Sequence, residues 1–160
     1  MYIWCLDNQL TPHPGKSEVM LLSARNPMGP IAPAFIEGSN LRWVTKTRLL
    51  GMTVDHKLTW APHALDIKKS FANKLDLLKR FRFLPTKFLR DFYFNVILSS
   101  VKYGLVLWGA CCDSDLFHSI ERLHCRASRI IFNLPKDMAS CDALGYNQWP
   151  TLFILQAGYL

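Results

Sequence analysis

The chain has 160 residues, of which 50% are hydrophobic, 12% aromatic and 19% charged. This length and composition suit one ordinary globular core and exclude a disordered tail or a collagen-like repeat. Nineteen Lys and Arg against twelve Asp and Glu give a formal charge of +7. The positive excess favours partners with negative charge, although net charge says nothing about the fold.

Turn-forming residues crowd the first third of the chain, where Pro and Gly recur from Pro12 to Gly51. Short runs with strand character lie among them at residues 18–23, 31–37 and 48–54, after a helix end within residues 1–10. The close spacing of these runs favours hairpins over crossover connections. We therefore expect a small antiparallel sheet in this part of the chain.

From Trp60 onward the hydrophobic residues recur at helical spacing. Four of them follow an i, i+4, i+8, i+11 pattern, namely Ile67, Phe71, Leu75 and Leu78. They predict an amphipathic helix that runs to about residue 83. A second helix is expected to begin at Pro85 or Thr86 and to end between Gly104 and Gly109.

A third helix is expected after Asp113 or Ser114, either of which can cap its first turn. Its apolar residues repeat at heptad-like spacing until Pro135 stops the helix. Residues 140–144 and 150–157 predict short helices at the end of the chain. The predicted fold class is thus α+β, a small antiparallel sheet followed by a mainly α-helical bundle.

The cysteines and the apolar segments narrow the class of protein further. The five Cys form no CxxC pair, which predicts neither a disulfide framework nor a four-thiolate zinc site. No basic leader precedes an apolar run at the N-terminus, so we expect an intracellular protein, nuclear or cytoplasmic. Residues 92–112 are the most apolar stretch, but they include Lys102 and two glycines, which favours a buried helix and a turn over a membrane span.

A group of Cys and His side chains resembles metal ligands in composition. Its members are Cys111, Cys112, His118, His124 and Cys125. Their spacing matches no structural zinc pattern, and most of them fall within one helix and face several directions. We therefore expect no metal site and interpret these thiols as buried.

Positive charge is concentrated in the first two predicted long helices. Residues 57–102 hold ten Lys and Arg and three acids, a net charge of +7 that equals that of the whole chain. At 100° per residue, Lys68, Lys79 and Arg82 fall within roughly 60° of one another around the helix axis. The first helix is thus predicted to bury one face and to present a basic face to its surroundings.

This concentration of charge predicts a sequence-independent track for phosphates, whose affinity falls with salt. A solvated helix face is the alternative interpretation of the same pattern. The residues that we predict to contact nucleic acid are Lys68, Lys69, Lys79, Arg80, Arg82, Lys87 and Arg90. A second stripe on the third helix, formed by Arg122, Arg126 and Arg129, is interpreted as solvated surface.

The motifs of a self-contained enzyme are missing from the sequence. It has no Walker loop, GxGxxG, HExxH or GxSxG motif, and no two Asp residues are adjacent. One residue can carry proton transfer. Lys16 lies in a Pro14-Gly15 turn, where a lysine held in place could act as an acid toward a departing phosphate. A solvated turn lysine is the alternative.

Four groups of residues, in order along the chain, resemble the reverse transcriptases of non-LTR (LINE-type) retrotransposons. Residues 4–11 with Pro14, Lys16, Ser17 and Glu18 resemble the helix and turn called motif D. Residues 49–55, followed by 57–60 and His63, are similar to the motif E hairpin, the primer grip, and the entry to the thumb. Tyr103-Gly104 with Trp108-Gly109 resembles the signature after the thumb helices, and residues 123–135 resemble the helix that follows it.

The resemblance implies a right-hand polymerase that copies RNA into DNA with two magnesium ions. Lys16 would match the motif D lysine proposed to protonate pyrophosphate, and Leu50, Gly51 and Met52 would match the primer grip. Residues 1–58 would then be a partial palm, residues 59–136 a thumb-like helical region and residues 137–160 a truncated helical segment. The basic helical hairpin would straddle an RNA, DNA or hybrid duplex by its backbone, as the deep groove of an A-like duplex requires.

The sequence departs from the family pattern in one decisive respect, because it contains no Asp-Asp pair. Two-metal transfer needs ligands that hold both ions about 4 Å apart. We therefore expect this chain to be inactive alone, to hold no cofactor itself, and to need the missing palm and fingers as partners. Two alternatives remain open: a stand-alone helical module whose third helix docks a protein, and a decayed product without function.

Overall fold

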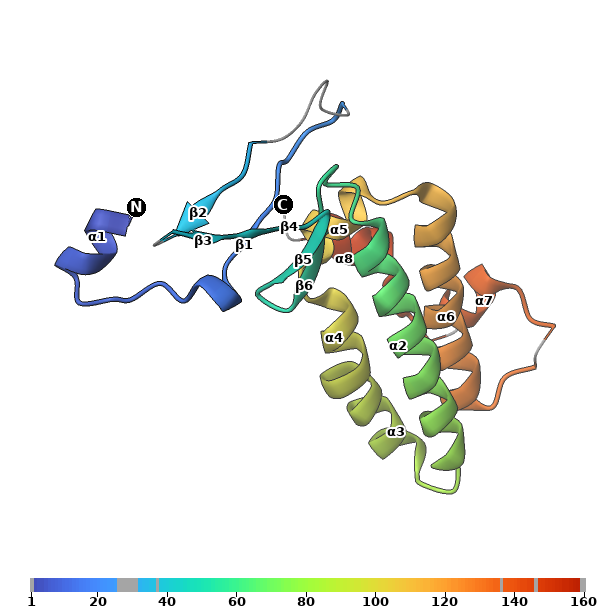
Figure 1. The fold of residues 1–160 in the computed structure, drawn as a ribbon. Coiled ribbons are helices and arrows are strands. Elements are labelled where there is room, and N and C mark those ends of the chain that lie inside the picture. The colour runs from blue at the N-terminus through green and yellow to red at the C-terminus, as the bar shows by residue number, and fades with distance from the viewer. Residues whose placement is uncertain (1, 26–31, 37, 136, 146, 159–160) are drawn as a thin grey trace. The chain divides into compact units, whose positions relative to one another are not determined.

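A computed structural model describes residues 2–25, 32–36, 38–135, 137–145 and 147–158, and it forms two compact units, Met1–Leu58 and Thr59–Leu160 (Figure 1). Short strands, one short α-helix and one 3-10 turn make up the first unit, and the second unit is helical. The α+β fold class predicted from the sequence is confirmed.

Unit 1 contains helix α1, a 3-10 turn and three two-stranded ladders. Its elements are α1 (Tyr2–Asp7), the 3-10 turn Pro14–Lys16, β1 (Glu18–Val19), β2 (Phe35–Ile36), β3 (Ser39–Asn40), β4 (Arg42–Trp43), β5 (Lys46–Leu49) and β6 (Met52–Asp55). β2 pairs with β3 and β5 with β6 as antiparallel hairpins. β1 instead pairs with β4 in parallel, so one of the three connections is a crossover.

The predicted strand 48–54 is in fact the middle of a hairpin. Leu49 faces Met52 across the β5–β6 ladder, and the chain reverses through Leu50 and Gly51, with φ of 49° and 83°. Positive φ at both central residues is the geometry of a type I′ turn, which matches the twist of antiparallel strands. Gly51 therefore marks a turn in the middle of the predicted strand. Of the predicted strand 31–37, only Phe35–Ile36 form a strand, β2, while residues 32–34 do not, and the two end residues lie outside the described residues.

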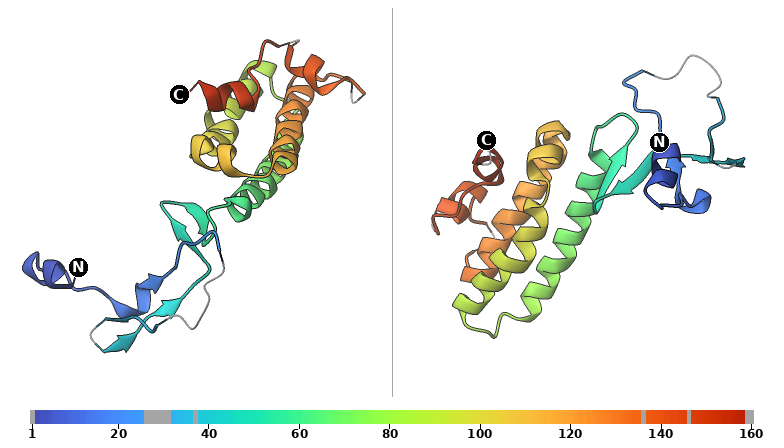
Figure 2. Two further views of the ribbon diagram at one scale, coloured as in Figure 1. Left: turned by 90° about the horizontal axis from the view of Figure 1, so that it is seen from above. Right: turned by 90° about the vertical axis from the view of Figure 1, so that its left-hand side faces the viewer.

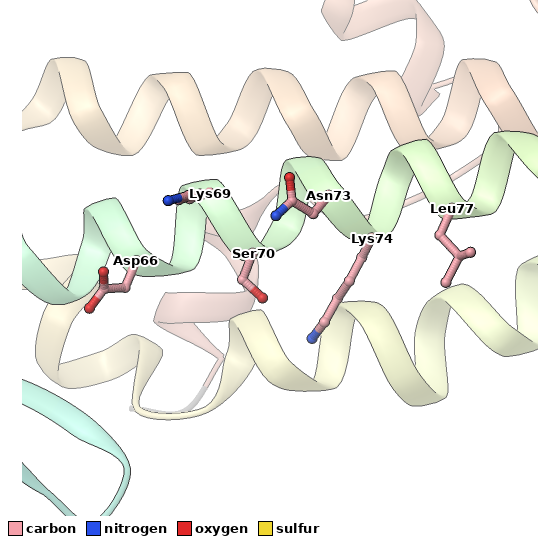
Figure 3. Close-up of a pocket in the computed structure, with 6 residues that line it drawn as sticks. All are labelled: Asp66, Lys69, Ser70, Asn73, Lys74 and Leu77. Atoms are coloured by element: carbon pink, nitrogen blue, oxygen red, sulfur yellow. The ribbon is translucent and has the colours of Figure 1, made fainter.

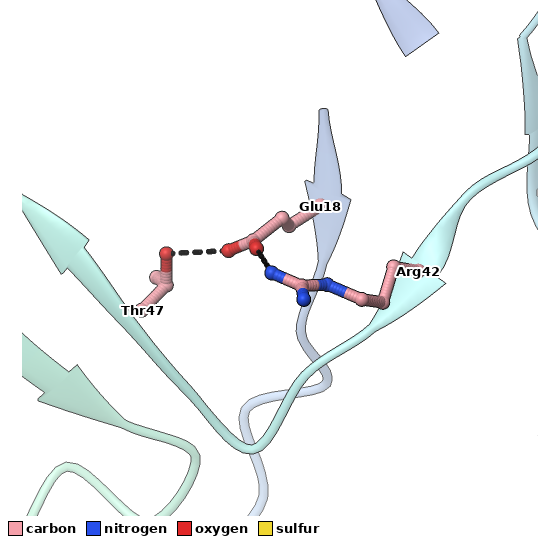
Figure 4. A network of polar contacts seen from close by, with 3 residues as sticks. All are labelled: Glu18, Arg42 and Thr47. Atoms are coloured by element: carbon pink, nitrogen blue, oxygen red, sulfur yellow. Dashed lines mark hydrogen bonds and ion pairs between the residues drawn. The ribbon is translucent and has the colours of Figure 1, made fainter. Parts of the chain in front are cut away.

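A carboxylate ties three strands of unit 1 together. The Glu18 side chain on β1 accepts hydrogen bonds from the Arg42 guanidinium on β4 and from the Thr47 hydroxyl on β5, the latter at 2.9 Å (Figure 4). These two hydrogen bonds lower the pKa of Glu18 below its usual value. The interactions fix the parallel register of a ladder that is only two residues long.

Unit 2 consists of helices that pack around one hydrophobic core (Figure 2). Its elements are α2 (Ala61–Arg80), α3 (Thr86–Phe92), the π-helical turn η2 (Tyr93–Leu98), α4 (Ser99–Lys102), α5 (Leu105–Cys111), α6 (Ser114–Phe132), α7 (Ser140–Gly145) and α8 (Leu152–Ala157). The predicted second helix is thus α3, η2 and α4 in continuation. The short helices predicted near the end are α7 and α8, which pack on α6 and α5.

Helices α2 and α6 lie side by side and run in the same direction, as all views show. Asp76 of α2 contacts Arg126 of α6, and Arg82 after α2 contacts Asn133 after α6. The buried faces of both helices enter the core. The buried apolar residues of these two helices are Ala64, Phe71, Leu75, Leu78, Phe117, Ile120, Cys125, Ala127, Ile130 and Ile131. The apolar face of α6 is therefore covered within unit 2.

The Tyr103-Gly104 and Trp108-Gly109 pairs build the bend between α4 and α5. Gly104 has a φ of 66°, which ends one helix and starts the next. The buried Trp108 indole donates a hydrogen bond to the Tyr103 carbonyl at 3.1 Å and so closes the bend. A Cβ on Gly109 would lie 3.0 Å from the Phe117 ring, so a larger residue there would require the ring to shift where α5 approaches α6. The sequence marked this bend but did not predict α5.

No single helix in the described residues is long and apolar enough to cross a membrane, although α3 to α4 taken with α5, bent by 59°, passes that test as a pair.

A buried histidine joins the C-terminal segment to the helical core. His124, fully buried, accepts a hydrogen bond from the Tyr93 hydroxyl at Nδ1 and donates one from Nε2 to the Pro150 carbonyl at 3.0 Å, a tautomer assigned from these partners. The Trp149 ring stacks on the Tyr93 ring with centroids 5.1 Å apart. Burial lowers the pKa of His124 to about 4.

This histidine predicts an acid-sensitive fold. Between pH 6.5 and 4 the unfolded chain binds a proton at His124 that the folded chain does not, so stability falls as pH falls through this window. The full loss in the free energy of unfolding is about 3 kcal/mol. We expect urea unfolding at pH 7 and pH 4.5 to show most of this loss.

The control for this measurement is His124→Gln, which keeps one donor and one acceptor but does not titrate. Burial raises the pKa of Glu121 and gives the opposite dependence, while Glu18 loses its contribution as pH falls. Glu121 and Glu18 both remain in the variant, so their contributions cancel when the pH dependence of the variant's stability is subtracted from that of the unsubstituted protein. The same pH dependence in both proteins would show that His124 does not carry it.

Candidate nucleic-acid interface

Four cationic side chains meet in a pocket where α2 and α6 end. We call this the α2–α6 pocket, and its volume is about 600 Å³. Its lining residues are Lys79, Arg82, Arg126, Arg129, Ile130, Asn133, Leu134 and Pro135. The parallel packing of the two helices brings their C-terminal turns together and so places these cations side by side.

One carboxylate lies between two of the four cations. An Asp76 oxygen is 3.1 Å from a guanidinium nitrogen of Arg126 and 3.4 Å from the Lys79 amine. Asp76 is largely exposed, so solvent screens these ion pairs and they contribute little to stability. They orient Lys79 and Arg126 while cancelling only one of their two charges.

The other two cations are held by neutral acceptors. Arg82 donates to the side-chain oxygen of Asn133, and Arg129 donates to the Met138 carbonyl at 2.9 Å. Asn133 itself has a φ of 53° at the end of α6, a conformation that asparagine tolerates better than most residues. The residues that line the pocket include four cations and no Asp or Glu, so its lining is positively charged toward a diffusing anion.

A second basic pocket lies on the other side of the end of α6. It has a volume of about 670 Å³ and is lined by Lys87, Arg90 and the acidic Asp91 of α3, and by Phe132 of α6. The guanidinium carbon of Arg90 is 6.0 Å from the centroid of the Phe94 ring. A smaller pocket of about 340 Å³ shares Arg82 and Asn133 with the first pocket and Phe132 with the second, so the three pockets are neighbours.

We call the six cations around this end of the helix the α6-end basic surface. Its members are Lys79, Arg82, Lys87, Arg90, Arg126 and Arg129. The structure thus brings together four of the seven residues that the sequence pointed to, and it adds Arg126 and Arg129.

The remaining three predicted residues lie elsewhere. Lys69 lines a separate pocket along α2, of about 440 Å³, together with Asp66 and Lys74 (Figure 3). The Lys74 amine extends to α4, where it donates to the Ser100 hydroxyl at 2.7 Å. Lys68 is half-buried and Arg80 is exposed, and neither lines any of these four pockets.

The arginines of α6 were visible in the sequence as an i, i+4, i+7 stripe but were interpreted as solvated surface. What the stripe could not reveal was the direction of α6 beside α2. A parallel arrangement sets Arg126 and Arg129 beside Lys79 and Arg82, whereas an antiparallel one would separate them. The exposed Arg122, one turn earlier, stays outside the α2–α6 pocket.

Lys16 lies in a turn of unit 1 that is held by its neighbours. The His13 imidazole accepts a hydrogen bond from the Gly15 amide at 3.1 Å, and the Ser17 hydroxyl donates to the His13 carbonyl at 3.0 Å. The Lys16 amide closes the turn on the same carbonyl, and its side chain is exposed. The backbone at Lys16 is therefore fixed while its amine is available to solvent.

The residues that resemble a primer grip form the tip of the β5–β6 hairpin. Leu50 is 78% exposed and Leu49 is 60% exposed, so two leucines project from this tip. Arg48 braces the turn by donating from Nε to the Gly51 carbonyl at 3.3 Å. Met52, the first residue of β6, is half-buried. An apolar tip on a braced hairpin is suited to contact another surface.

The described residues contain no group of three or more His, Cys, Asp or Glu side chains placed to hold a metal ion. Cys125 is buried and Cys112 is half-buried, but Cys111 is exposed, which differs from the expectation of buried thiols.

Comparison with known proteins finds no matching family model and no matching solved structure. It does find curated proteins of Drosophila melanogaster. The probable RNA-directed DNA polymerase from transposon BS is 26% identical over 136 residues, which cover 82% of this chain and 15% of that protein. The probable RNA-directed DNA polymerase from transposon X-element is 26% identical over 103 residues, 62% of this chain and 11% of that protein.

The chain is related to the RNA-directed DNA polymerases of transposons. This relationship confirms the resemblance to non-LTR reverse transcriptases that the four groups of residues indicated. The chain spans only a small part of these polymerases, so the similarity does not show that this chain has their activity.

The hairpin tip generates a stability prediction. A leucine in the left-handed region costs roughly 1–2 kcal/mol, whereas Asn-Gly is the preferred type I′ sequence. Leu50→Asn is therefore expected to stabilise the β5–β6 hairpin by about 1 kcal/mol, seen as slower amide hydrogen exchange in β5 and β6.

Leu49→Asn is the matched control, because it replaces a neighbouring exposed leucine in an extended conformation and offers no relief of strain. It is expected to leave exchange unchanged or to speed it up. Equal effects of the two substitutions would contradict the assignment of strain to Leu50.

Proposed function

We propose that this chain serves as a nucleic-acid-holding segment of a transposon RNA-directed DNA polymerase. Unit 2 holds the backbone of RNA, DNA or a hybrid duplex at the α6-end basic surface. The single observation that carries this proposal is that six cations converge around the end of α6. Of the four cations in the α2–α6 pocket, two share the Asp76 carboxylate.

The arrangement of these cations suits phosphates. Guanidinium groups bind phosphate oxygens through two parallel hydrogen bonds, and four of the six cations are arginines. Arg82 and Arg129 are oriented by neutral acceptors, so less freedom is lost when a phosphate arrives. Contacts of this kind position a backbone and carry no sequence information.

Unit 1 has two features that fit the same polymerase. The Leu50–Gly51 tip offers an apolar contact of the kind expected at a primer grip, and Lys16 offers an amine on a fixed turn for proton transfer to pyrophosphate. Both functions depend on the palm and fingers, which would supply the carboxylates and the Mg²⁺. For the chain itself we propose binding and no chemical step.

The salt dependence of binding tests this proposal. The logarithm of the affinity for duplex is expected to fall linearly with the logarithm of salt concentration, with a slope of about 0.9 per phosphate neutralised. Arg82→Ala with Arg126→Ala should lower that slope by about two and weaken binding equally for different sequences. Fluorescence anisotropy with labelled hybrid duplexes at several salt concentrations measures both.

Arg122→Ala with Arg80→Ala is the matched control, since it removes the same charge from exposed positions on α6 and α2 that do not line the α2–α6 pocket. It is expected to change the slope by less than one. An equal loss in both double variants would indicate a diffuse charge effect, and binding confined to one sequence would contradict a backbone contact.

A further inference from the structure

We propose that the α2–α6 pocket receives one unpaired nucleotide of a single-stranded or bulged nucleic acid, with its phosphate on the cations and its base against the apolar wall. This inference rests on the proposed function and narrows it, because it assigns to one of the three neighbouring pockets a ligand other than duplex backbone.

The pocket has two chemically distinct parts. Lys79, Arg82, Arg126 and Arg129 supply the positive charge, and Ile130, Leu134 and Pro135 supply an apolar wall. A backbone lying across the cations would leave this wall without a partner. A nucleotide matches both parts at once, because it joins a phosphate to a flat, largely apolar ring.

Size and geometry also favour a single nucleotide. A volume of about 600 Å³ falls within the range of about 300–1,000 Å³ that is usual for sites of small ligands. In a duplex the bases are paired and stacked, so they cannot enter such a pocket. An unpaired base can turn out of the strand and stack on a guanidinium plane, a frequent contact in recognition of single-stranded RNA.

A competing explanation is that the cations only stabilise the C-terminal ends of α2 and α6. Cations at such positions interact favourably with the helix dipole. Two of the four do carry out local tasks, since Arg82 bonds to Asn133 and Arg129 bonds to the Met138 carbonyl. This role explains charge at the helix ends but gives no reason for an apolar wall beside it.

Titration of the full chain with three small probes separates these possibilities. The probes are adenosine 5′-monophosphate, ribose 5-phosphate and adenosine, followed by NMR of the Ile130 and Leu134 methyl groups. We expect the monophosphate to bind about tenfold or more tightly than ribose 5-phosphate, as base stacking implies, and more tightly than adenosine. Both methyl groups should shift with the monophosphate.

Two substitutions locate the two halves of the ligand. Leu134→Ser is expected to reduce the affinity for the monophosphate to about that for ribose 5-phosphate and to leave the latter unchanged. Arg126→Ala should weaken both phosphate-bearing probes. Leu107→Ser is the control, because it replaces a half-exposed leucine on α5 outside the pocket, and it should change neither.

The outcomes distinguish this inference from the proposed function. Equal affinities for the monophosphate and ribose 5-phosphate, with salt-sensitive duplex binding intact, would overturn the nucleotide pocket and leave the backbone surface standing. No binding of any probe or duplex, with loss of thermal stability in Arg82→Ala, would overturn both and assign the cations to the helix ends.

Discussion

Everything proposed for unit 2 depends on the parallel packing of α2 against α6. Phe71, Leu75 and Leu78 of α2 are almost completely buried and meet the buried face of α6. Burial of each such side chain is worth about 1.5–3 kcal/mol, which far exceeds the repulsion among partly solvated cations. The hydrophobic contact thus holds Lys79, Arg82, Arg126 and Arg129 together at one end, where Asp76 contacts two of them.

Much of this arrangement is present in the sequence as periodicity. Apolar residues at helical spacing located α2, the long second helix and α6, because each of these helices buries one continuous face. Gly51 and Gly104 marked the two sharp changes of direction, although only the structure showed that the first is a hairpin tip and the second separates two helices. Local signals therefore placed the elements but not the pairings between them.

The site was harder to predict than the fold for the same reason. Helical periodicity places Lys68, Lys79 and Arg82 on one face, yet only Lys79 and Arg82 line the α2–α6 pocket. The other two cations of this pocket come from α6. Arg126 and Arg129 are more than forty residues away along the chain from these lysines and arginines. A single sequence carries no information on the relative direction of two helices, so their meeting could not be foreseen. The parallel ladder of β1 and β4, fixed by Glu18 and Arg42, is a second case.

The π-helical turn η2 has a consequence for how this segment tolerates change in length. Leu89 before it, Tyr93 and Ile97 within it, and Val101 after it all face the core. A π turn holds one more residue than an α-helical turn of the same height. Deleting one residue from Tyr93–Leu98 would therefore turn it into an α-helical turn and keep Val101 facing the core, whereas deleting one residue from α3 would rotate everything beyond it by about 100°. Related chains are therefore expected to differ by at most one residue in length between Leu89 and Val101, through the presence or absence of this π turn.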